Sequence, residues 1–157
     1  MGDDVTMLSA TNIVDTLYED IPCVLLTPEG TELRNFIISK STAHHEIRRL
    51  SITIWNTEHQ LEVGSLIISI TPIDVSFCID VEMTTYIIGK PSFGNWATSE
   101  YTTSVNRTVF SAEKSKYEEI LAFIILLGNV QVTKSCSGFN RLDADAIVSL
   151  KDWIQAR

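Results

Sequence analysis

One stretch of the chain alternates between two series of side chains, and it constrains the fold more than any other feature. The stretch runs from Phe77 to Ile88. Its first series is apolar apart from one threonine and consists of Phe77, Ile79, Val81, Met83, Thr85 and Ile87. Because successive side chains of a strand point to opposite faces, this alternation predicts a β-strand with one buried face. A sheet with one apolar face needs a covering layer, which the chain must also provide.

Other segments bounded by turn residues also predict strands. They are rich in β-branched or apolar residues and cover 23–26, 32–39, 50–55, 66–71 and, as an edge strand, 101–105. The first two are expected to form a hairpin around a turn over 27–30. The next two are separated by a long polar loop over 56–64, and Pro72 is expected to end the second of them. Together with the strand from Phe77, these two predict an antiparallel meander.

The N-terminal segment predicts a first helix. Apolar residues at helical spacing follow a cap at Thr11 or Asn12, and Pro22 is expected to end the helix. Residues 1–21 are also expected to be either mobile or used in self-association.

Two further helices are expected in the second half. The longer one covers about 111–127, is capped by Ser111 or by Ser115 with Glu118, and is apolar nearly all round, which predicts burial on two sides. Gly128 is expected to end it, and a valine strand over 130–135 to follow. Asp143 is expected to cap a last helix with an apolar stripe.

The length of 157 residues and the 45% hydrophobic content fit one globular domain with its own core. The fold class predicted is therefore α+β, with a single domain over 1–157. An antiparallel sheet packs against the apolar helix at about 111–127, and the N- and C-terminal helices flank it. No cofactor is expected, because phosphate-binding glycine loops, nucleophile elbows and zinc motifs are absent from the sequence.

The net charge of −8 arises entirely from residues 1–80. Capture of nucleic acid or anionic lipid by the whole surface is therefore disfavoured, and no sequence-specific nucleic-acid binding is expected. The second half can still form a local basic patch from Arg107, Lys114, Lys116 and Lys134. The alternative is that these four cations belong to an ordinary solvated surface.

The cysteines and the N-terminus bear on the compartment. Cys23, Cys78 and Cys136 are odd in number and far apart, which predicts free buried thiols in a reducing compartment. The start, Met1 to Asp4, is acidic where a secretory signal would be basic, and no apolar run approaches the roughly 20 residues needed to span a bilayer. We therefore expect an intracellular protein that does not span a membrane.

Three aromatic residues are candidates for partner binding. Phe93 and Trp96 stand in a loop over 89–96, where they can form a docking tip, since aromatic side chains dominate interface hot spots. The alternative is that they fold back on the core. Trp153, on the last helix, is a candidate for self-association, with a core position as its alternative.

The three histidines form one adjacent pair and one isolated residue. His44 and His45 stand beside Glu46, but a metal site would need at least a third ligand, so a solvated loop is the preferred interpretation. His59 is isolated. A small cofactor-free enzyme built from such isolated residues is a minor alternative, and the chain is expected not to be an enzyme.

The second half resembles the C-terminal part of rhabdovirus matrix proteins, in particular plant-infecting, cytorhabdovirus-like members. Residues 79–86 match the family's sheet strand, 116–123 match its helix, and 130–135 with 137–139 match the strand and turn that follow. The Lys-rich N-terminus and the Pro-Pro-x-Tyr motif of animal-virus members have no counterpart here, which puts membrane binding by charge in doubt.

The resemblance implies a structural protein of the virion and the host cytoplasm. Such a protein self-associates and condenses a nucleocapsid beneath the envelope. Its implied partners are further copies of itself, the viral nucleoprotein–RNA complex and, peripherally, a membrane surface, and it implies no catalytic residues. A second hypothesis is an intracellular viral adaptor, or host-factor-binding protein, that uses the 89–96 loop.

Overall fold

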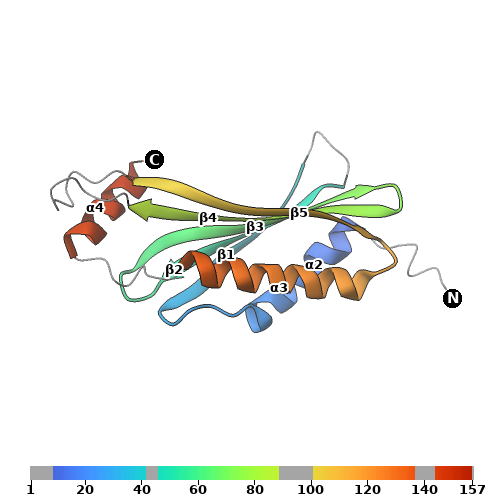
Figure 1. Ribbon diagram of the computed structural model, residues 1–157, viewed down its shortest axis with the longest axis horizontal. Helices are drawn as coiled ribbons and strands as arrows, with labels where there is room; N and C mark the ends of the chain where they lie inside the picture. The colour runs from blue at the N-terminus through green and yellow to red at the C-terminus, as the bar shows by residue number, and fades with distance from the viewer. Residues whose placement is uncertain (1–8, 42–45, 89–100, 137–143, 157) are drawn as a thin grey trace.

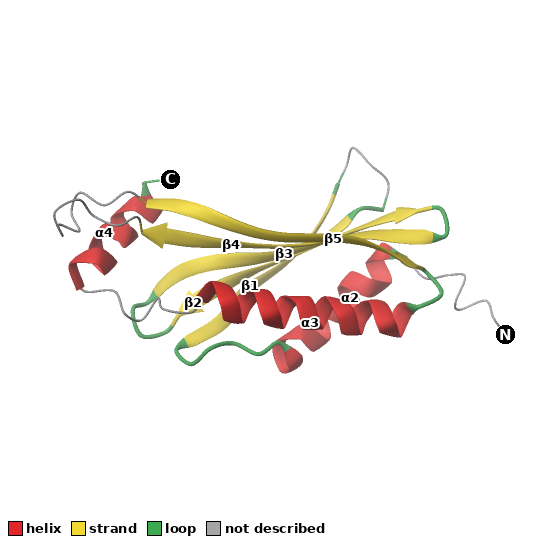
Figure 2. Ribbon diagram, in the orientation of Figure 1, coloured by secondary structure: helices red, strands yellow, loops and turns green. Residues whose placement is uncertain are grey.

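The computed structural model describes residues 9–41, 46–88, 101–136 and 144–156. These residues form a five-stranded antiparallel sheet and three helices, which confirms the predicted single-domain α+β class (Figures 1 and 2). The strands are β1 (Thr31–Lys40), β2 (Arg48–Asn56), β3 (Leu61–Ile73), β4 (Ser76–Ile88) and β5 (Tyr101–Glu113). The helices are α2 (Ala10–Val24), α3 (Tyr117–Cys136) and α4 (Ala144–Gln155).

The strands lie in the sheet in the order in which they occur in the chain, β1 to β5. The expected meander is therefore correct and extends to all five strands. In β4, the alternation predicted from the sequence holds as far as the structure describes it, since Phe77, Ile79, Val81 and Met83 are fully buried. Their partners on β3, among them Ile68 and Ile70, are buried on the same face.

Helices α2 and α3 lie on the same side of the sheet and cover this apolar face (Figure 2). Helix α2 begins one turn earlier than expected, because the Ser9 side chain, rather than Thr11 or Asn12, accepts the capping bond from the Asn12 N–H at 3.3 Å. Its apolar residues Ile13 and Leu17 are buried in the core. Residues 10–21 thus belong to the folded core rather than to a mobile tail.

Pro22 does not end α2, which continues to Val24. The helix tolerates Pro22 in its last turn because only one backbone bond is lost there, and Leu25 N–H still donates to Ile21 O at 2.9 Å. The expected strand over 23–26 is therefore wrong, and so is the hairpin built on it. The partner of β1 is β2.

The loop between β2 and β3 is shorter than expected. Residues 57–60 form a tight connection, and β3 starts at Leu61 instead of Leu66. At its other end β3 continues through Pro72 to Ile73. Proline is tolerated because Pro72 lies beyond Ile70, the last β3 residue paired with β2, so this part of the strand has a neighbour on one side only.

The long helix lies further along the chain than expected. Strand β5 continues to Glu113, and α3 begins at Tyr117, where Ile120 N–H donates to Lys116 O at 2.9 Å. The helix then passes through Gly128, so the expected stop there and the valine strand over 130–135 are both wrong. Val132 is buried whereas Val130 is exposed, as a helical period requires.

Gly128 has a packing role instead. A Cβ atom at this position would lie 2.9 Å from Leu25 Cδ1 and 3.6 Å from Leu66 Cδ2. Glycine therefore lets α3 approach Leu25 in the chain that leaves α2, whereas the distance to Leu66 of the sheet would be an ordinary contact.

Helix α4 lies at one end of the sheet, apart from α2 and α3 (Figure 1). Ile147 and Leu150 are buried, as the predicted apolar stripe requires. The Trp153 ring packs edge to face against Tyr86 of β4, with 5.8 Å between centroids.

Candidate interaction surfaces

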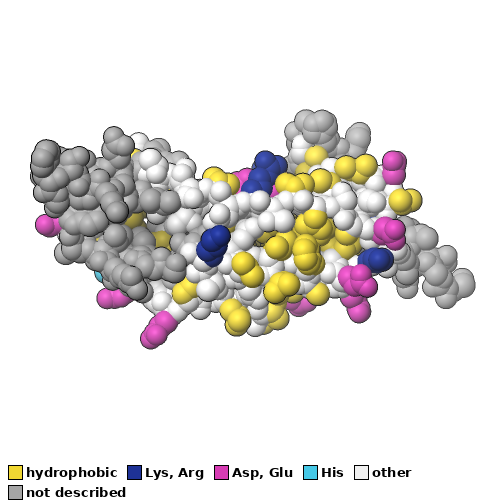
Figure 3. All heavy atoms as spheres, viewed as in Figure 1, with side chains coloured by type: hydrophobic (Ala, Val, Ile, Leu, Met, Phe, Trp, Pro, Cys, Tyr) yellow, Lys and Arg dark blue, Asp and Glu magenta, His cyan; other side chains and the backbone are white. Residues whose placement is uncertain are grey.

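The four cations of the expected basic patch do not come together. Lys116 precedes α3 and Lys134 lies in its last turns, so about 27 Å of helix separates them. Arg107 lies on β5. On the face shown in Figure 3, the Lys and Arg side chains lie apart from one another. The expectation that Lys134 would end a strand beside Lys114 and Lys116 fails because 130–135 is helical.

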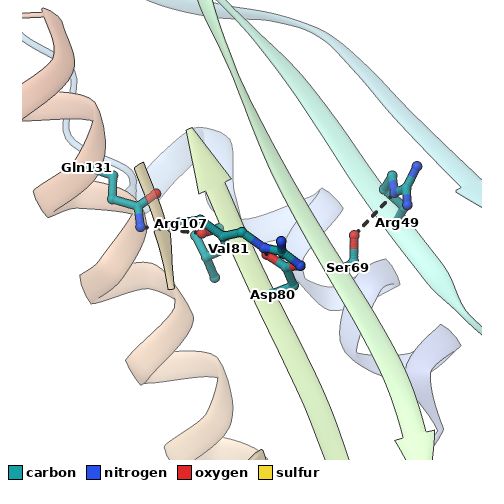
Figure 4. A network of polar contacts seen from close by, with 6 residues as sticks. All are labelled: Arg49, Ser69, Asp80, Val81, Arg107 and Gln131. Atoms are coloured by element: carbon teal, nitrogen blue, oxygen red, sulfur yellow. Dashed lines mark hydrogen bonds and ion pairs between the residues drawn. The ribbon is translucent and has the colours of Figure 1, made fainter. Parts of the chain in front are cut away.

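Arg107 is held by a carboxylate of the neighbouring strand. Its Nε lies 2.9 and 3.1 Å from the two Asp80 carboxylate oxygens, and its Nη2 lies 2.5 Å from Oδ2 (Figure 4). These hydrogen bonds and the charge of Asp80 raise the pKa of the Arg107 guanidinium, with a smaller contribution from Glu82. Figure 4 also shows Arg49 Nε bonded to Ser69 on the adjacent strands, at 3.2 Å.

Lys114 and Lys116 lie in the connection between β5 and α3. The Lys114 ammonium lies 5.3 Å from the centroid of the buried Phe77 ring, so its stem covers the end of the core. Lys116 is exposed. Of the predicted cations, Lys116 is thus the one next to a helix N-terminus and open to solvent.

The aromatic candidates have different outcomes. Trp153 is half-buried and packs against Tyr86 and the core, so it holds α4 to the sheet. Phe93 and Trp96 lie outside the described residues. Their role as a docking tip stays a prediction.

Of the three histidines, only His59 is described. His59 lies in the β2–β3 turn, where its backbone N–H donates to Asn56 Oδ1 at 2.8 Å. His44 and His45 lie outside the described residues. Within the described part of the chain, no group of three or more His, Cys, Asp or Glu side chains is arranged to hold a metal ion.

The side chains of Cys23 and Cys78 are described, and both are free thiols. The expectation of burial is wrong for Cys23, which is exposed at the end of α2, while Cys78 is half-buried. No helix among the described segments has the length and apolar character to cross a bilayer.

An exposed apolar surface lies on the outer side of α3, where the sequence had predicted burial on both sides. Phe123, Leu126 and Val130 follow helical spacing and are 43, 57 and 54% exposed. Leu26, which is 70% exposed, lies beside them, because its N–H is bonded to Asn129 of α3. We call these four residues the α3 outer surface. Figure 3 shows hydrophobic side chains gathered over the middle of this side of the molecule.

A shallow groove adjoins this surface where α3 meets β5. It has a volume of about 370 Å³, and its lining includes Phe110, Ala112, Ile120 and Phe123, with Lys116 and Glu119 at its polar end. The rings of Phe110 and Phe123 meet edge to face, 4.7 Å between centroids. The groove therefore joins the sheet edge to the α3 outer surface.

A buried glutamine fixes α3 on the sheet. Gln131 is 7% exposed, and its Nε2 lies 3.4 Å from Val81 O (Figure 4). The same Nε2 lies 3.4 Å from Thr108 Oγ1. Sequence reasoning missed it, because the strand interpretation placed Gln131 on a solvent face.

Comparisons with protein-family models, with curated proteins and with solved structures each returned no match.

Proposed function

We propose that this protein is a non-enzymatic structural protein that self-associates and links a nucleocapsid to an envelope, as viral matrix proteins do. The observation that supports it most directly is the α3 outer surface.

Three parts of the chain resemble the matrix family. The segment 79–86 lies within β4, and the segment 116–123 lies within α3 apart from its first residue. The third, 130–135, is helical and not a strand, and the turn 137–139 lies outside the described residues.

The α3 outer surface favours contact between protein molecules. Its four members are large apolar side chains, three on the covering helix α3 and the fourth, Leu26, in the segment that follows α2, and they are exposed within a single copy. Burying such surface is favourable by about 25 cal/mol per Å² of apolar area. Contiguous exposed apolar patches on a folded chain typically mark interaction sites.

The charges suit attachment by many copies rather than by one. The net charge of −8 opposes binding of a single molecule to phosphate, and the lysines at the two ends of α3 are far apart. Each cation near an anionic surface contributes about 1 kcal/mol, which an assembled layer multiplies through avidity. Self-association should therefore precede nucleocapsid binding.

The test is sedimentation velocity over a series of protein concentrations. We expect the unchanged chain to form assemblies, and the double variant Leu126→Ser with Val130→Ser to form fewer, with its free energy of unfolding changed by less than about 1 kcal/mol. Val148→Ser is the matched control, because Val148 is similarly exposed, at 58%, but lies on α4. Equal loss of assembly in the control and the double variant would contradict a role for the α3 outer surface.

Attachment is tested separately by pelleting the protein with purified nucleocapsids at low salt. Lys116→Glu should weaken pelleting without harming the fold, because a carboxylate is favourable at a helix N-terminus. Glu119→Lys, at the same end of α3, should strengthen it. An assembling protein that does not pellet with nucleocapsids would overturn the matrix role.

A further inference from the structure

Strand β5 is a long and regular edge strand, and no other strand of the described residues pairs with its outer side. Its pairing with β4 runs from Ser76 opposite Glu113 to Ile88 opposite Tyr101 without a shift of register. In the five-stranded sheet β5 is the last strand and pairs with β4 alone. In Figures 1 and 2, β5 and α3 form the side toward the viewer, and no other described element lies in front of β5.

The register between β4 and β5 identifies the backbone groups on that edge. Lys114 N–H donates to Val75 O at 2.9 Å, which continues the β4–β5 ladder by one pair. In an antiparallel ladder, alternate residues direct N–H and C=O to the same neighbour. The backbone N–H and C=O groups therefore point toward β4 at Thr108, Phe110 and Ala112. They point outward, away from β4, at Val109 and Ser111.

We infer that β5 pairs antiparallel with β5 of a second copy around a two-fold axis, which joins the two five-stranded sheets into one continuous sheet. This inference rests on the proposed function, because it names one contact through which copies of the chain associate. An isologous contact of this kind requires the strand to be complementary to itself.

Charge complementarity favours a second copy and selects the register. With the axis at Phe110, each Arg107 lies opposite the Glu113 of the other chain, and Val109 lies opposite Ser111. An axis at Arg107 would instead oppose two cations. In the chosen register, the odd-numbered residues with outward N–H and C=O groups lie opposite each other, as hydrogen bonding requires.

The groove beside β5 is consistent with this register. An axis at Phe110 brings together the two grooves in which Phe110 meets Phe123. The 43% exposed Phe123 rings would then be covered from both copies. Aromatic side chains in a desolvated centre contribute strongly to interfaces.

The experiment compares Val109→Pro with Val109→Thr in the full chain. Proline removes an outward N–H without removing a bond to β4, while threonine keeps both the N–H and the β-branched shape. We expect the dissociation constant of the dimer to rise about 100-fold in the proline variant. Two hydrogen bonds between the paired β5 strands are lost per dimer, and the proline ring crowds the contact between them. Val109→Thr should stay associated. Far-ultraviolet circular dichroism checks that both variants are folded.

A measurement on the unchanged chain does not depend on the folding of any variant. Hydrogen exchange at the Val109 and Ser111 amides should slow as protein concentration rises through the association range, and exchange at the Thr108 amide should stay slow throughout. Rapid exchange at Val109 and Ser111 in fully associated protein would overturn the β5 contact.

The outcomes separate the contact from the proposed function. Association of Val109→Pro equal to that of the unchanged chain overturns the β5 contact and leaves self-association standing. A dimer that Val109→Pro abolishes, in a protein that does not bind nucleocapsids, supports the contact and overturns the matrix role. A chain that stays monomeric at every concentration overturns both.

Discussion

Strands β1 and β5 form the two edges of the same sheet, yet they are built differently. Strand β1 carries an extra residue between Arg34 and Ile37, and Asn35 there has a φ of 54°. Strand β5 pairs with its neighbour without interruption over its whole length. A bulge twists a strand and breaks the regular row of edge groups, so it discourages pairing with another chain.

The side chains reinforce this difference. Near the bulge, the Arg34 guanidinium lies over the Trp55 ring, 4.5 Å from its centroid, and Lys40 ends the strand. On β5, Arg107 is paired with Asp80 of the same chain, but its side chain stays 56% exposed, so its remaining N–H groups are open to a carboxylate of a second copy. A regular edge is better suited to receive another strand than a bulged edge that ends in lysine. The difference between the two edges supports the proposed contact at β5 rather than at β1.

The largest effect is expected from a change that weakens the whole fold and spares both edges. Ile68 is fully buried on β3, the central strand, so Ile68→Ala should lower the free energy of unfolding by about 2–5 kcal/mol. Chemical denaturation measures this loss. If association follows the β5 edge and not overall stability, the folded variant should sediment like the unchanged chain. Loss of association in the folded variant would show that association depends on overall stability and not on the β5 edge.

A smaller effect is expected from making β1 resemble β5. Deleting Asn35 leaves Arg34 and Phe36 adjacent and on their present faces, because the bulge adds one residue to β1. We expect stability to change by less than about 1–2 kcal/mol, since a left-handed residue is removed. Association should rise, with larger species in sedimentation velocity.

Asn35→Gly is the matched control, because glycine keeps the bulge and adopts positive φ without strain. If the deletion and the glycine variant sediment alike, the bulge does not protect β1.

The smallest effect is expected at the ion pair on β5. Asp80→Asn removes the carboxylate that holds Arg107, a side chain open to solvent. The thermal midpoint should hardly change, and any change should vanish in high salt. Differential scanning calorimetry at two salt concentrations checks this.

No pH dependence is expected from Arg107 itself. A raised pKa gives stability that is present below the pKa of the unfolded chain and is lost as pH rises through the pKa of the folded chain. For an arginine, whose pKa is raised from an already high value, that range lies above neutral and mildly alkaline pH. Loss of association between about pH 6 and 9 would therefore have to come from other groups.

The sheet could be predicted from the sequence because its signal is local. The alternation in β4 and the β-branched segments of β2 and β3 are consistent with burial of one face, and the structure bears them out. The wrong predictions concern residues that were expected to end a helix but lie inside one, because tertiary packing stabilises the longer helix. Pro22 lies in a last turn that can spare a bond, and Gly128 lies in a contact between α3, Leu25 and Leu66.

The surfaces were harder to predict, because they depend on how elements meet. Val130 and Val132, two residues apart, fit a strand as well as a helix, and the wrong choice misplaced Lys134. Strand β5 was recognised only near 101–105, and nothing local shows that an edge is free along its length. Asn35 gives no sequence signal of a bulge, although asparagine tolerates positive φ better than most residues.

The order of the strands also determines which apolar surface is exposed to solvent while the chain is being synthesised. Each strand pairs with its predecessor, so hairpins can form as soon as the chain leaves the ribosome, and α2 is ready to cover part of them. Helix α3 follows all five strands, and its hydroxyl contact with α2, Thr16 Oγ1 to Tyr117 Oη at 2.5 Å, forms only afterwards. A nascent chain that has emerged from the ribosome as far as Glu113 can thus form the complete sheet, while α3, one of the two helices that cover its apolar face, is still missing. At that stage it is most exposed to aggregation and most dependent on chaperones.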